Sequence, residues 1–290
     1  MLNWLIRQTL KLKSGEKGTM GIETPVPELF VFHSETDLRD VSQLQESGIC
    51  LILQGRKDVR VGDQHYRYQA GEFVCYTVDL PIMTEYLTDN GGYLDLRLFF
   101  DLPLMREIID ELNRQNFSFA PASQQKIVST ASPELIRAFE MLISLTENSQ
   151  DLPIMLPLIK KAIYFYLLTG EQGGTLRQIA LQNSNSQRIV ETVGWLKEHY
   201  NESFDIEQLA AASSMSISGF YAQFRRLTGM SPLQYQKNLR LTKANALLKL
   251  GQKNISEIAF EIGYDSLPQF SREYKRYFGH SPRSDLSRAG

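Results

Sequence analysis

Two segments of the sequence place cationic and polar side chains on the outer face of a short predicted helix. Phe220 and Phe224, four residues apart, share one buried helical face. Phe270 and Tyr274 repeat that spacing in the second segment. The opposite face carries polar groups near its start and basic groups near its end, which suits a helix that meets base edges and then phosphates in a DNA major groove. The outward positions are Ser218, Ala222 and Arg225, flanked by Tyr221 and Arg226, and Pro268, Arg272 and Lys275, flanked by Ser271 and Arg276. The predicted phosphate contacts are Arg225, Arg226, Lys275 and Arg276.

These helices belong to a unit that the sequence contains twice, in residues 206–232 and 255–282. Each copy reads as a short helix, a tight turn and a second helix that stops at a glycine, the pattern of a helix-turn-helix. Ser216 is the predicted N-cap of the first outward-facing helix, and Asp265 or Ser266 that of the second. Basic residues on a helix can also be mere solvated surface. The repetition of the whole unit, caps included, favours binding to nucleic acid.

The segment 231–250 joins the two units and reads as one helix, with Ser231 as its cap and Pro232 in its first turn. About 18 residues would span roughly 27 Å. Successive major-groove faces on one side of B-DNA lie about 34 Å apart. A stiff helix of that order can hold two recognition helices in adjacent turns of the groove, with some bending of the duplex.

The stretches GMSPLQYQKNLRLTKANALL and EIAFEIGYDSLPQFSREYKRYFGHSP closely resemble the AraC/XylS family of bacterial transcription regulators. The resemblance implies that both recognition helices lie in consecutive major-groove segments. Ala222 stands where members often carry a longer polar side chain, so first-helix readout would rest on Tyr221 and on thymine-methyl contact. Pro268 offers no hydrogen bond. Carried over by position, the base-reading residues are Ser218, Tyr221, Ala222, Gln269, Ser271 and Arg272.

The chain of 290 residues has a net charge of −2, which is unevenly divided. Residues 186–290 carry 14 lysines and arginines against 10 acidic residues, whereas residues 1–185 carry 17 against 23. This length predicts two domains. We place an effector-binding and dimerisation domain at residues 1–182 and a double helix-turn-helix domain at residues 183–290.

Short apolar runs between Val26 and Asp101, separated by turn residues, predict an all-β barrel or sandwich. Gly62-Asp63 is a hairpin signal. The run SGICLILQGRKDVRVGDQHYRYQAGEFVCYTVDLPI and the later LPLIKKAIYFYLLTGEQGGTLRQIA resemble the YqhC-like subgroup of the same family, which implies a cupin-like β-barrel with adjacent dimerising helices. The expected fold class is therefore α+β, with the barrel and its flanking helices preceding an all-α domain.

One face of residues 93–100 mixes aromatic and charged groups, which suits a ligand pocket, a solvated face or a helix contact. The candidate pocket residues are Tyr66, Tyr68, Cys75, Tyr76, Tyr93 and Arg97.

Helices are expected after the barrel, in residues 103–115, 133–148 and 157–170, with an apolar stripe that is either core or dimer interface. Residues 171–186 are expected to be a boundary loop, with Gly173-Gly174 as a turn. The next helix is predicted over Arg188–Tyr200. Residues 2–10 predict a short amphipathic helix packed on the body.

The sequence offers no catalytic constellation and no metal-ligand spacing, and we expect no cofactor. Cys50 and Cys75 are read as small buried hydrophobes, with redox or electrophile sensing as the alternative. No long apolar run predicts a membrane span.

These observations predict a sequence-specific DNA-binding transcriptional regulator, an effector-responsive activator in the cytoplasm of a bacterium. The candidate partners are double-stranded DNA, a small-molecule effector, RNA polymerase and a second copy of the chain. The alternatives are a cupin-type enzyme fused to a DNA-binding module, and a constitutive DNA binder with a purely structural barrel.

Overall fold

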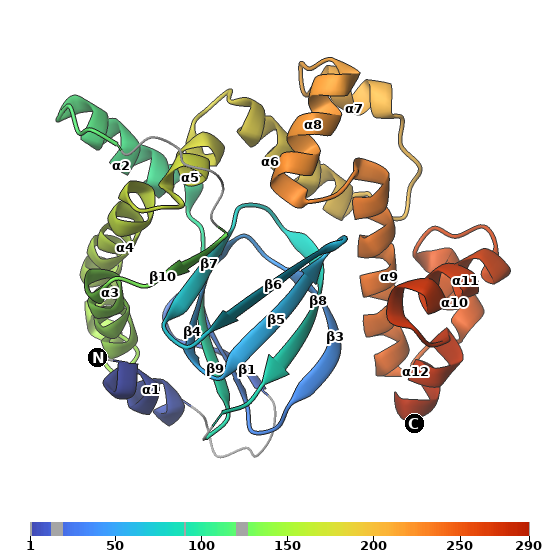
Figure 1. Cartoon of the computed structure of the whole chain (residues 1–290), viewed down its shortest axis with the longest axis horizontal. Helices are drawn as coiled ribbons and strands as arrows, with labels where there is room; N and C mark the ends of the chain where they lie inside the picture. Colours follow the sequence, from blue (N-terminus) through green and yellow to red (C-terminus); the bar gives the residue numbers. More distant parts are fainter. Residues whose placement is uncertain (1, 13–19, 90, 120–126, 290) are drawn as a thin grey trace.

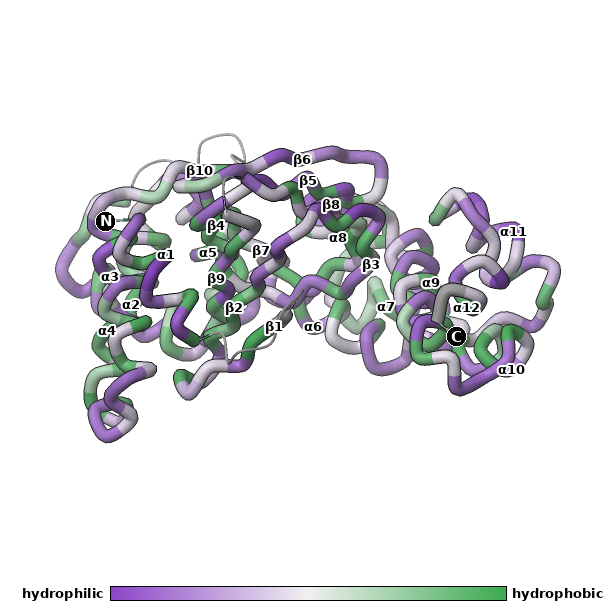
Figure 2. Tube along the Cα trace, turned by 90° about the horizontal axis from the view of Figure 1, so that it is seen from below, coloured by the Kyte–Doolittle hydropathy of each residue, from purple (hydrophilic) through white to green (hydrophobic). Residues whose placement is uncertain are grey.

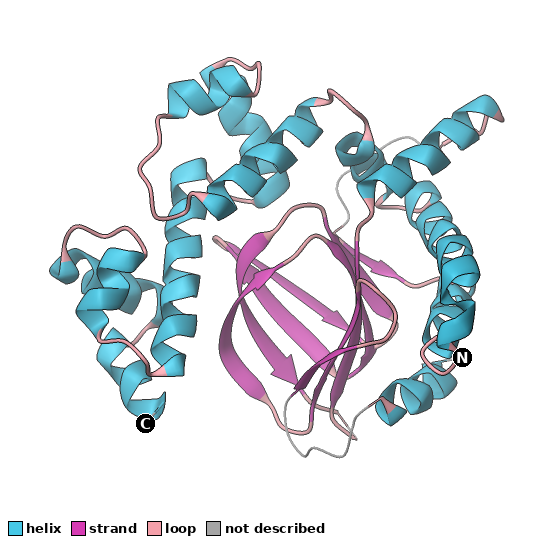
Figure 3. Cartoon of the chain, turned by 180° about the vertical axis from the view of Figure 1, so that it is seen from behind, coloured by secondary structure: helices cyan, strands magenta, loops and turns pink. Residues whose placement is uncertain are grey.

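The computed structural model describes residues 2–12, 20–89, 91–119 and 127–289. The strands lie between residues 20 and 130, and the chain from residue 185 onward is helical (Figures 1 and 3). The predicted fold class, a strand-rich N-terminal part with flanking helices followed by an all-helical C-terminal part, is confirmed.

The barrel consists of two antiparallel sheets, which do not hydrogen-bond to one another within the described residues, so the barrel is not closed. The larger sheet has the order β1 (Met20–Glu23), β2 (Leu29–Ser34), β9 (Tyr93–Phe99), β4 (Gly48–Gln54), β7 (Glu72–Tyr76), β10 (Val128–Thr130). The smaller sheet has the order β3 (Leu38–Gln45), β8 (Leu80–Leu87), β5 (Arg56–Val61), β6 (Gln64–Gln69). The predicted hairpin at Gly62-Asp63 joins β5 to β6, with Gly62 at φ 57°.

One group of helices covers one side of the barrel (Figure 1). These helices are α1 (Leu2–Lys11), α2 (Leu102–Arg114), α3 (Pro133–Ser144), α4 (Leu152–Thr169) and α5 (Gly173–Ala180), with a 3₁₀ turn at Ser149–Asp151. The predicted stripe on α3 is buried, and Ser132 caps that helix through Leu135. In α4, Lys160 lies 2.6 Å from a Glu28 carboxylate oxygen and 2.9 Å from one of Asp101, which fixes the helix to the barrel.

The prediction of a loop at Gly173-Gly174 is wrong, because these glycines begin α5. A side chain at Gly173 would overlap the carbonyl oxygen of Leu168, so only glycine lets α5 turn this sharply off the end of α4. Burial of Leu176 and Ile179 then holds α5 in place.

The C-terminal part begins with α6 (Asn185–Glu198), three residues earlier than predicted because Ser184 caps it through Gln187. The first repeat unit forms α7 (Ile206–Ala212) and α8 (Ile217–Thr228), and the second forms α10 (Ile255–Glu261) and α11 (Leu267–Phe278). Between them α9 runs as one helix over Pro232–Leu250, capped by Ser231 as predicted. The chain ends in α12 (Pro282–Ala289).

The helix α9 connects the two parts, because it packs on β3 and β8. Figure 2 shows the result: α3 and α4 lie at one end of the molecule and α10 to α12 at the other. The barrel therefore lies between its own helices and the double helix-turn-helix.

Candidate nucleic-acid interface and effector cavity

The helices α8 and α11 have the same construction at an offset of 50 residues. Ser216 and Ser266 are their N-caps, accepting hydrogen bonds from the backbone N–H of Gly219 and Gln269. The buried aromatic pairs lie inside as predicted. Each helix stops at a left-handed glycine, with φ 74° at Gly229 and φ 82° at Gly279.

The predicted DNA-contacting positions lie on the accessible faces of these two helices. Tyr221 and Ser271 are half-exposed, and the others are exposed. The burial pattern from Phe220 to Arg226 repeats residue by residue from Phe270 to Arg276. Two equivalent surfaces, each aromatic inside and basic outside, therefore face solvent.

Several cations on these surfaces have no acidic partner. In the described part of the chain, Arg225, Arg272, Lys275 and Arg276 make no ion pair and donate no side-chain hydrogen bond. By contrast, other cations of the helical part are paired: Lys197 with Asp79 at 2.6 Å, Lys237 with Glu273 at 3.1 Å and Lys253 with Glu261 at 2.6 Å. Unpaired cations leave the full charge available to an incoming phosphate.

Arg226 differs from the other predicted phosphate contacts. Its guanidinium donates to the side-chain oxygens of Gln223 (3.1 Å), Gln178 (2.9 Å) and Ser186 (2.8 Å), all of them neutral acceptors. Partial burial lowers the pKa of Arg226 below its ordinary value. To reach a phosphate, this side chain must break its hydrogen bonds to Gln178 of α5 and Ser186 of α6.

Glu273 orients the second recognition helix. It accepts a hydrogen bond from the Tyr264 hydroxyl at 2.9 Å and from the side-chain amide of Gln269 at 3.4 Å, besides its ion pair with Lys237. Burial opposes its charge, but these bonds hold its pKa below the ordinary value. The Gln269 amide is thereby held toward Glu273 when no DNA is present.

Arg240 of α9 fixes the spacing of the two units. Its guanidinium donates to the carbonyl oxygens of Tyr200 (2.6 Å), Gly263 (2.8 Å) and Glu202 (2.9 Å). It thus joins the end of α6 to the turn of the second unit. Sequence reasoning missed this role, because a helical arginine gives no sign of which backbone carbonyls it will meet.

The β5–β6 hairpin touches the C-terminal ends of both recognition helices. Gly62 lies against the backbone of Gly229, just after α8. On the same hairpin, Arg60 donates to the carbonyl oxygen of Tyr277 in α11 at 3.1 Å. The barrel is therefore in direct contact with the elements predicted to read DNA.

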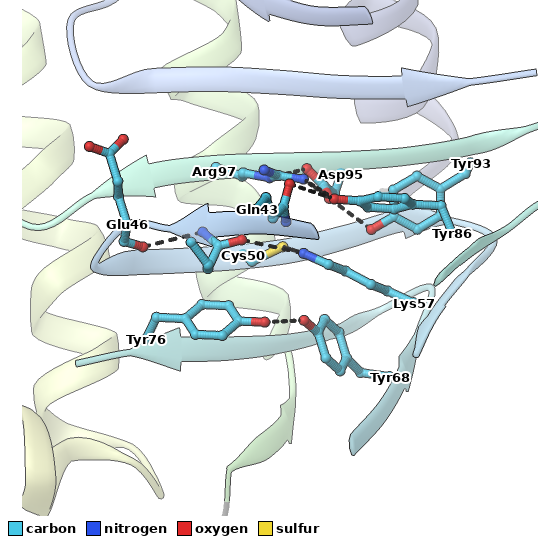
Figure 4. Close-up of polar contacts among 11 residues, drawn as sticks. Gln43, Glu46, Cys50, Lys57, Tyr68, Tyr76, Tyr86, Tyr93, Asp95 and Arg97 are labelled. Atoms are coloured by element: carbon cyan, nitrogen blue, oxygen red, sulfur yellow. Dashed lines mark hydrogen bonds and ion pairs between the residues drawn. The ribbon is translucent and has the colours of Figure 1, made fainter. Parts of the chain in front are cut away.

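The barrel interior holds a buried polar network (Figure 4). Arg97 makes two hydrogen bonds to Asp95, at 2.9 and 3.1 Å, and Tyr93 donates to the same carboxylate at 2.7 Å. Burial would raise the pKa of Asp95, but the charges of Arg97 and Lys57 hold it below the ordinary value. Two of the candidate pocket residues, Tyr93 and Arg97, thus hydrogen-bond within this buried network.

Lys57 is fully buried in the same network. Its ammonium lies 3.4 Å from the Gln45 side-chain oxygen and 3.9 Å from the Cys50 sulfur, with the rings of Tyr68, Tyr76 and Tyr86 within 6 Å. Burial opposes the charge of Lys57, while Cys50 and the tyrosines hold its pKa above the ordinary value.

The other four candidate pocket residues, Tyr66, Tyr68, Cys75 and Tyr76, do line one cavity of about 290 Å³. Its walls come from the barrel, from α5 and from the end of α8, including Arg225 and Arg226. The predicted pocket therefore opens between the barrel and the first recognition helix.

Sequence comparison now identifies the family. The profile of the AraC-type transcriptional regulator N-terminus matches residues 25–175, and a helix-turn-helix domain profile matches residues 209–288. The chain belongs to the AraC-type transcriptional regulators. It is accordingly a DNA-binding protein that acts in transcription, as the sequence predicted.

Individual relatives agree with this assignment. The thermoregulatory protein LcrF of Yersinia pestis is 24% identical over 257 residues, covering 85% of this chain and 91% of LcrF. The transcriptional activator RhaS of Klebsiella pneumoniae is 32% identical over 100 residues, but the match spans only 36% of RhaS and 34% of this chain. In structure, ToxT of Vibrio cholerae with bound unsaturated fatty acid superposes with a TM-score of 0.55 at 11% identity, covering 91% of this regulator and 96% of ToxT, which shows a shared fold.

The two cysteines of this regulator have environments that disfavour the thiolate. Burial raises the pKa of Cys50 to about 11 and raises that of Cys75 as well, so both stay thiols near neutral pH. The thiolate is the reactive form. Cys50 is buried, as predicted, whereas Cys75 is only half-buried and lines the cavity, so the prediction of a buried side chain is wrong for Cys75.

Proposed function

We propose that one chain of this regulator binds two adjacent major-groove segments, with α8 in one and α11 in the next. The observation that carries the proposal is the repeated surface, in which matching positions present unpaired cations such as Arg225 and Lys275. The 19 residues of α9 span about 28 Å, a separation of the order of one turn of B-DNA.

Base reading is assigned to accessible residues in the first two turns of each recognition helix. Arg272 is the strongest candidate for specificity, because arginine can donate two hydrogen bonds to the O6 and N7 of a guanine. Gln269 can pair with an adenine once it leaves Glu273. On α8, Tyr221 and Ala222 offer apolar contact to a thymine methyl group, with Ser218 beside them.

A footprint of the full chain on its operator tests this proposal, with protection expected in two segments one helical turn apart. Arg272→Ala should relax discrimination at one base pair by about 1–3 kcal/mol. The matched control is Lys253→Ala, which removes the same charge from a residue paired with Glu261. Protection of a single groove segment, or unchanged discrimination in Arg272→Ala, would contradict the proposal.

We further propose that the regulator is a cytoplasmic bacterial activator that responds to a small molecule without catalysing a reaction. RhaS is named as an activator, and ToxT has been solved with a fatty acid. The cavity beside α8 is the candidate effector site, since it joins the barrel to a DNA-reading element. A thermal-shift screen of small organic molecules tests effector binding.

A second copy of the chain is the proposed partner of α4. Ile154 and Leu158 on this helix are 71% and 57% exposed, and Met155 beside them is also exposed, so large apolar side chains gather on one helix. Residues 149–169 are long and apolar enough to cross a membrane, yet Lys160 at the middle is ion-paired to the barrel, so we read α4 as a packed helix. Replacing Leu158 by Glu should convert a dimer to a monomer in analytical ultracentrifugation.

A further inference from the structure

Glu273 on the recognition helix α11 accepts from three side chains, two of which lie outside that helix. Its carboxylate accepts a hydrogen bond from the Tyr264 hydroxyl at 2.9 Å, in the turn before α11, and pairs with Lys237 of α9 at 3.1 Å. The third donor is the side-chain amide nitrogen of Gln269, one helical turn earlier, at 3.4 Å. Only 21% of the Glu273 side chain is exposed. The contacts with Tyr264 and Lys237 therefore fix the position of this carboxylate.

The fixed carboxylate decides which way the Gln269 amide points. An ionised carboxylate only accepts hydrogen bonds, so Gln269 must turn its NH2 group toward Glu273. The carbonyl oxygen of the amide then points away from Glu273, and no side chain or backbone group in the described part of the chain donates to it. Gln269 is exposed on the first turn of α11. Its carbonyl oxygen is therefore free to accept from a base edge.

The first recognition helix lacks this arrangement. Gln223 stands at the position equivalent to Glu273, and Gly219, without a side chain, stands at the position equivalent to Gln269. The Gln223 amide is used for hydrogen bonds to α6 and within α8. A carboxylate on a helix that faces DNA is repelled by the phosphates, so Glu273 adds nothing to the electrostatic attraction of α11 for DNA. Its contacts indicate a different role, which is the orientation of Gln269.

We propose that Glu273 is a positioning residue, which turns the Gln269 carbonyl oxygen toward the major groove and thereby selects a base with an amino group. Adenine and cytosine present amino donors in the major groove, whereas guanine and thymine present acceptor oxygens, which cannot donate to Gln269. Unlike the two-bond pairing with adenine, this contact leaves Gln269 on Glu273. The inference rests on the proposed function, because it requires α11 to lie in the major groove.

The test first finds the base pair that Gln269 contacts. The full chain is selected on a library of randomised duplexes, and the contacted pair is the one at which Gln269→Ala loses discrimination. Four duplexes that differ only at this pair are then titrated. They form two groups whichever strand is read, because each amino base pairs with a base that presents an acceptor oxygen. The wild type should bind the group with the amino base on the contacted strand about 3- to 10-fold more tightly, the effect of one hydrogen bond.

Variants of Glu273 separate orientation from mere stability. Glu273→Gln keeps the size of the side chain, but its amide can present either a donor or an acceptor to Gln269. The ratio of the two groups should therefore fall to about one, a change that a uniform loss of affinity would not produce. Glu261→Gln is the matched control: Glu261 lies on α10, paired with Lys253, and should keep the wild-type ratio.

A second variant covers the case in which circular dichroism shows that Glu273→Gln is unfolded. Tyr264→Phe with Lys237→Met keeps the carboxylate but removes the two donors that fix its position. This double variant should also lower the ratio of the two groups of duplexes.

Two results would overturn the positioning role. One is equal affinity of the wild type for the two groups of duplexes, and the other is the wild-type ratio in Glu273→Gln. Failure of the proposed function is seen separately and earlier, as a chain that selects no duplex even at low salt or that protects a single groove segment. A chain that protects both segments but shows either of the two results keeps the proposed function and loses only the role of Glu273.

Discussion

Single residues at backbone turns hold the second helix-turn-helix in place. Gly263 has φ 87°, and a side chain there would overlap the carbonyl oxygen of Asn201. The equivalent residue of the first unit is Ser214, also in the left-handed region at φ 52° but without such close packing. The second unit therefore requires glycine at this position and the first unit does not, although both residues have a positive φ.

Gly263→Ala should therefore destabilise the chain by about 1–3 kcal/mol, from backbone strain and the overlap with Asn201. Gly194 supplies the matched control: it lies within α6 with nothing near its Cβ position. Gly194→Ala should stabilise that helix by about 0.5–1 kcal/mol. Urea denaturation followed by circular dichroism measures the free energy of unfolding of both variants. An unchanged free energy of unfolding in Gly263→Ala would be inconsistent with the packing described.

Asp285 fixes α12 to the rest of the helical part. Its carboxylate accepts hydrogen bonds from Asn245 at 3.0 Å and from the Tyr274 hydroxyl, and it lies 2.8 Å from the His280 ring nitrogen. Burial would raise the pKa of Asp285, but these partners hold it below the ordinary value. A depressed carboxyl pKa stabilises the folded chain at neutral pH, and this stabilisation is lost as the pH falls through the folded pKa.

Asp285→Asn should lower the free energy of unfolding at pH 7 by about 1–3 kcal/mol, because a charged acceptor is replaced by a neutral one. The deficit should be the same at pH 5, which is above the ordinary carboxyl pKa of about 3.9. At pH 3, below the ordinary carboxyl pKa, it should begin to shrink, because Asp285 then binds a proton in the unfolded wild-type chain and this stabilises the unfolded state. Urea midpoints at the three pH values give the answer, and a deficit independent of pH throughout would contradict this assignment.

At the scale of elements, sequence patterns predicted the parts with strong local signals. The caps at Ser216 and Ser231, the glycine stops of α8 and α11 and the hairpin at Gly62-Asp63 are local chemistry, and all of them are confirmed. The outward faces of α8 and α11 follow from helical periodicity alone.

Elements stabilised by distant partners were missed. The strand β3, LRDVSQLQ, is polar and has little strand pattern, but it pairs with β8 and is covered by α9. The helix α5 begins with two glycines that read locally as a turn. The sequence predicted the barrel side of the cavity but not its α8 side. Tertiary packing places Arg225 and Arg226 beside the barrel tyrosines, and no local pattern indicates this.

The rigidity of α9 relative to its neighbours depends on Arg240. Arg240→Ala would leave the carbonyl oxygens of Tyr200, Glu202 and Gly263 without this donor, and each unsatisfied group costs about 1–3 kcal/mol where water cannot replace it. We expect α11 to lose its fixed distance from α8, so footprinting should show weaker protection of the second groove segment. Lys249→Ala, an exposed residue on the same helix, is the matched charge control. Equal loss of both segments would instead indicate global unfolding.

For the whole molecule, the contact between the barrel and the helical part combines apolar packing with polar contacts. Met83 of β8 belongs to the same hydrophobic cluster as Leu241 and Ala244 of α9. Asp79 pairs with Lys197 of α6, its backbone carbonyl accepts from the Tyr235 hydroxyl of α9 at 2.8 Å, and Ser42 meets Thr242 at 3.0 Å. Arg60 adds the contact with α11.

Loss of two of these polar contacts should loosen the attachment of the helical part to the barrel. In the double variant Asp79→Ala and Arg60→Ala, small-angle scattering should show a larger radius of gyration than in the wild type. Each domain should keep its helical or strand content in circular dichroism. Asp58→Ala with Arg67→Ala, an ion pair at 2.8 Å within the barrel, is the control and should leave the radius unchanged.

The differences between the two recognition helices have a consequence for the polarity of the complex on DNA. Tyr221 and Ala222 on α8 correspond to Ser271 and Arg272 on α11, so side chains of different chemistry occupy equivalent positions. If these residues contact bases as proposed, we expect the two helices to prefer different base pairs and a single chain to bind a directional, non-palindromic site. Inverting that site in a promoter would turn the barrel and α4 to the opposite flank, away from whatever they face in the native orientation.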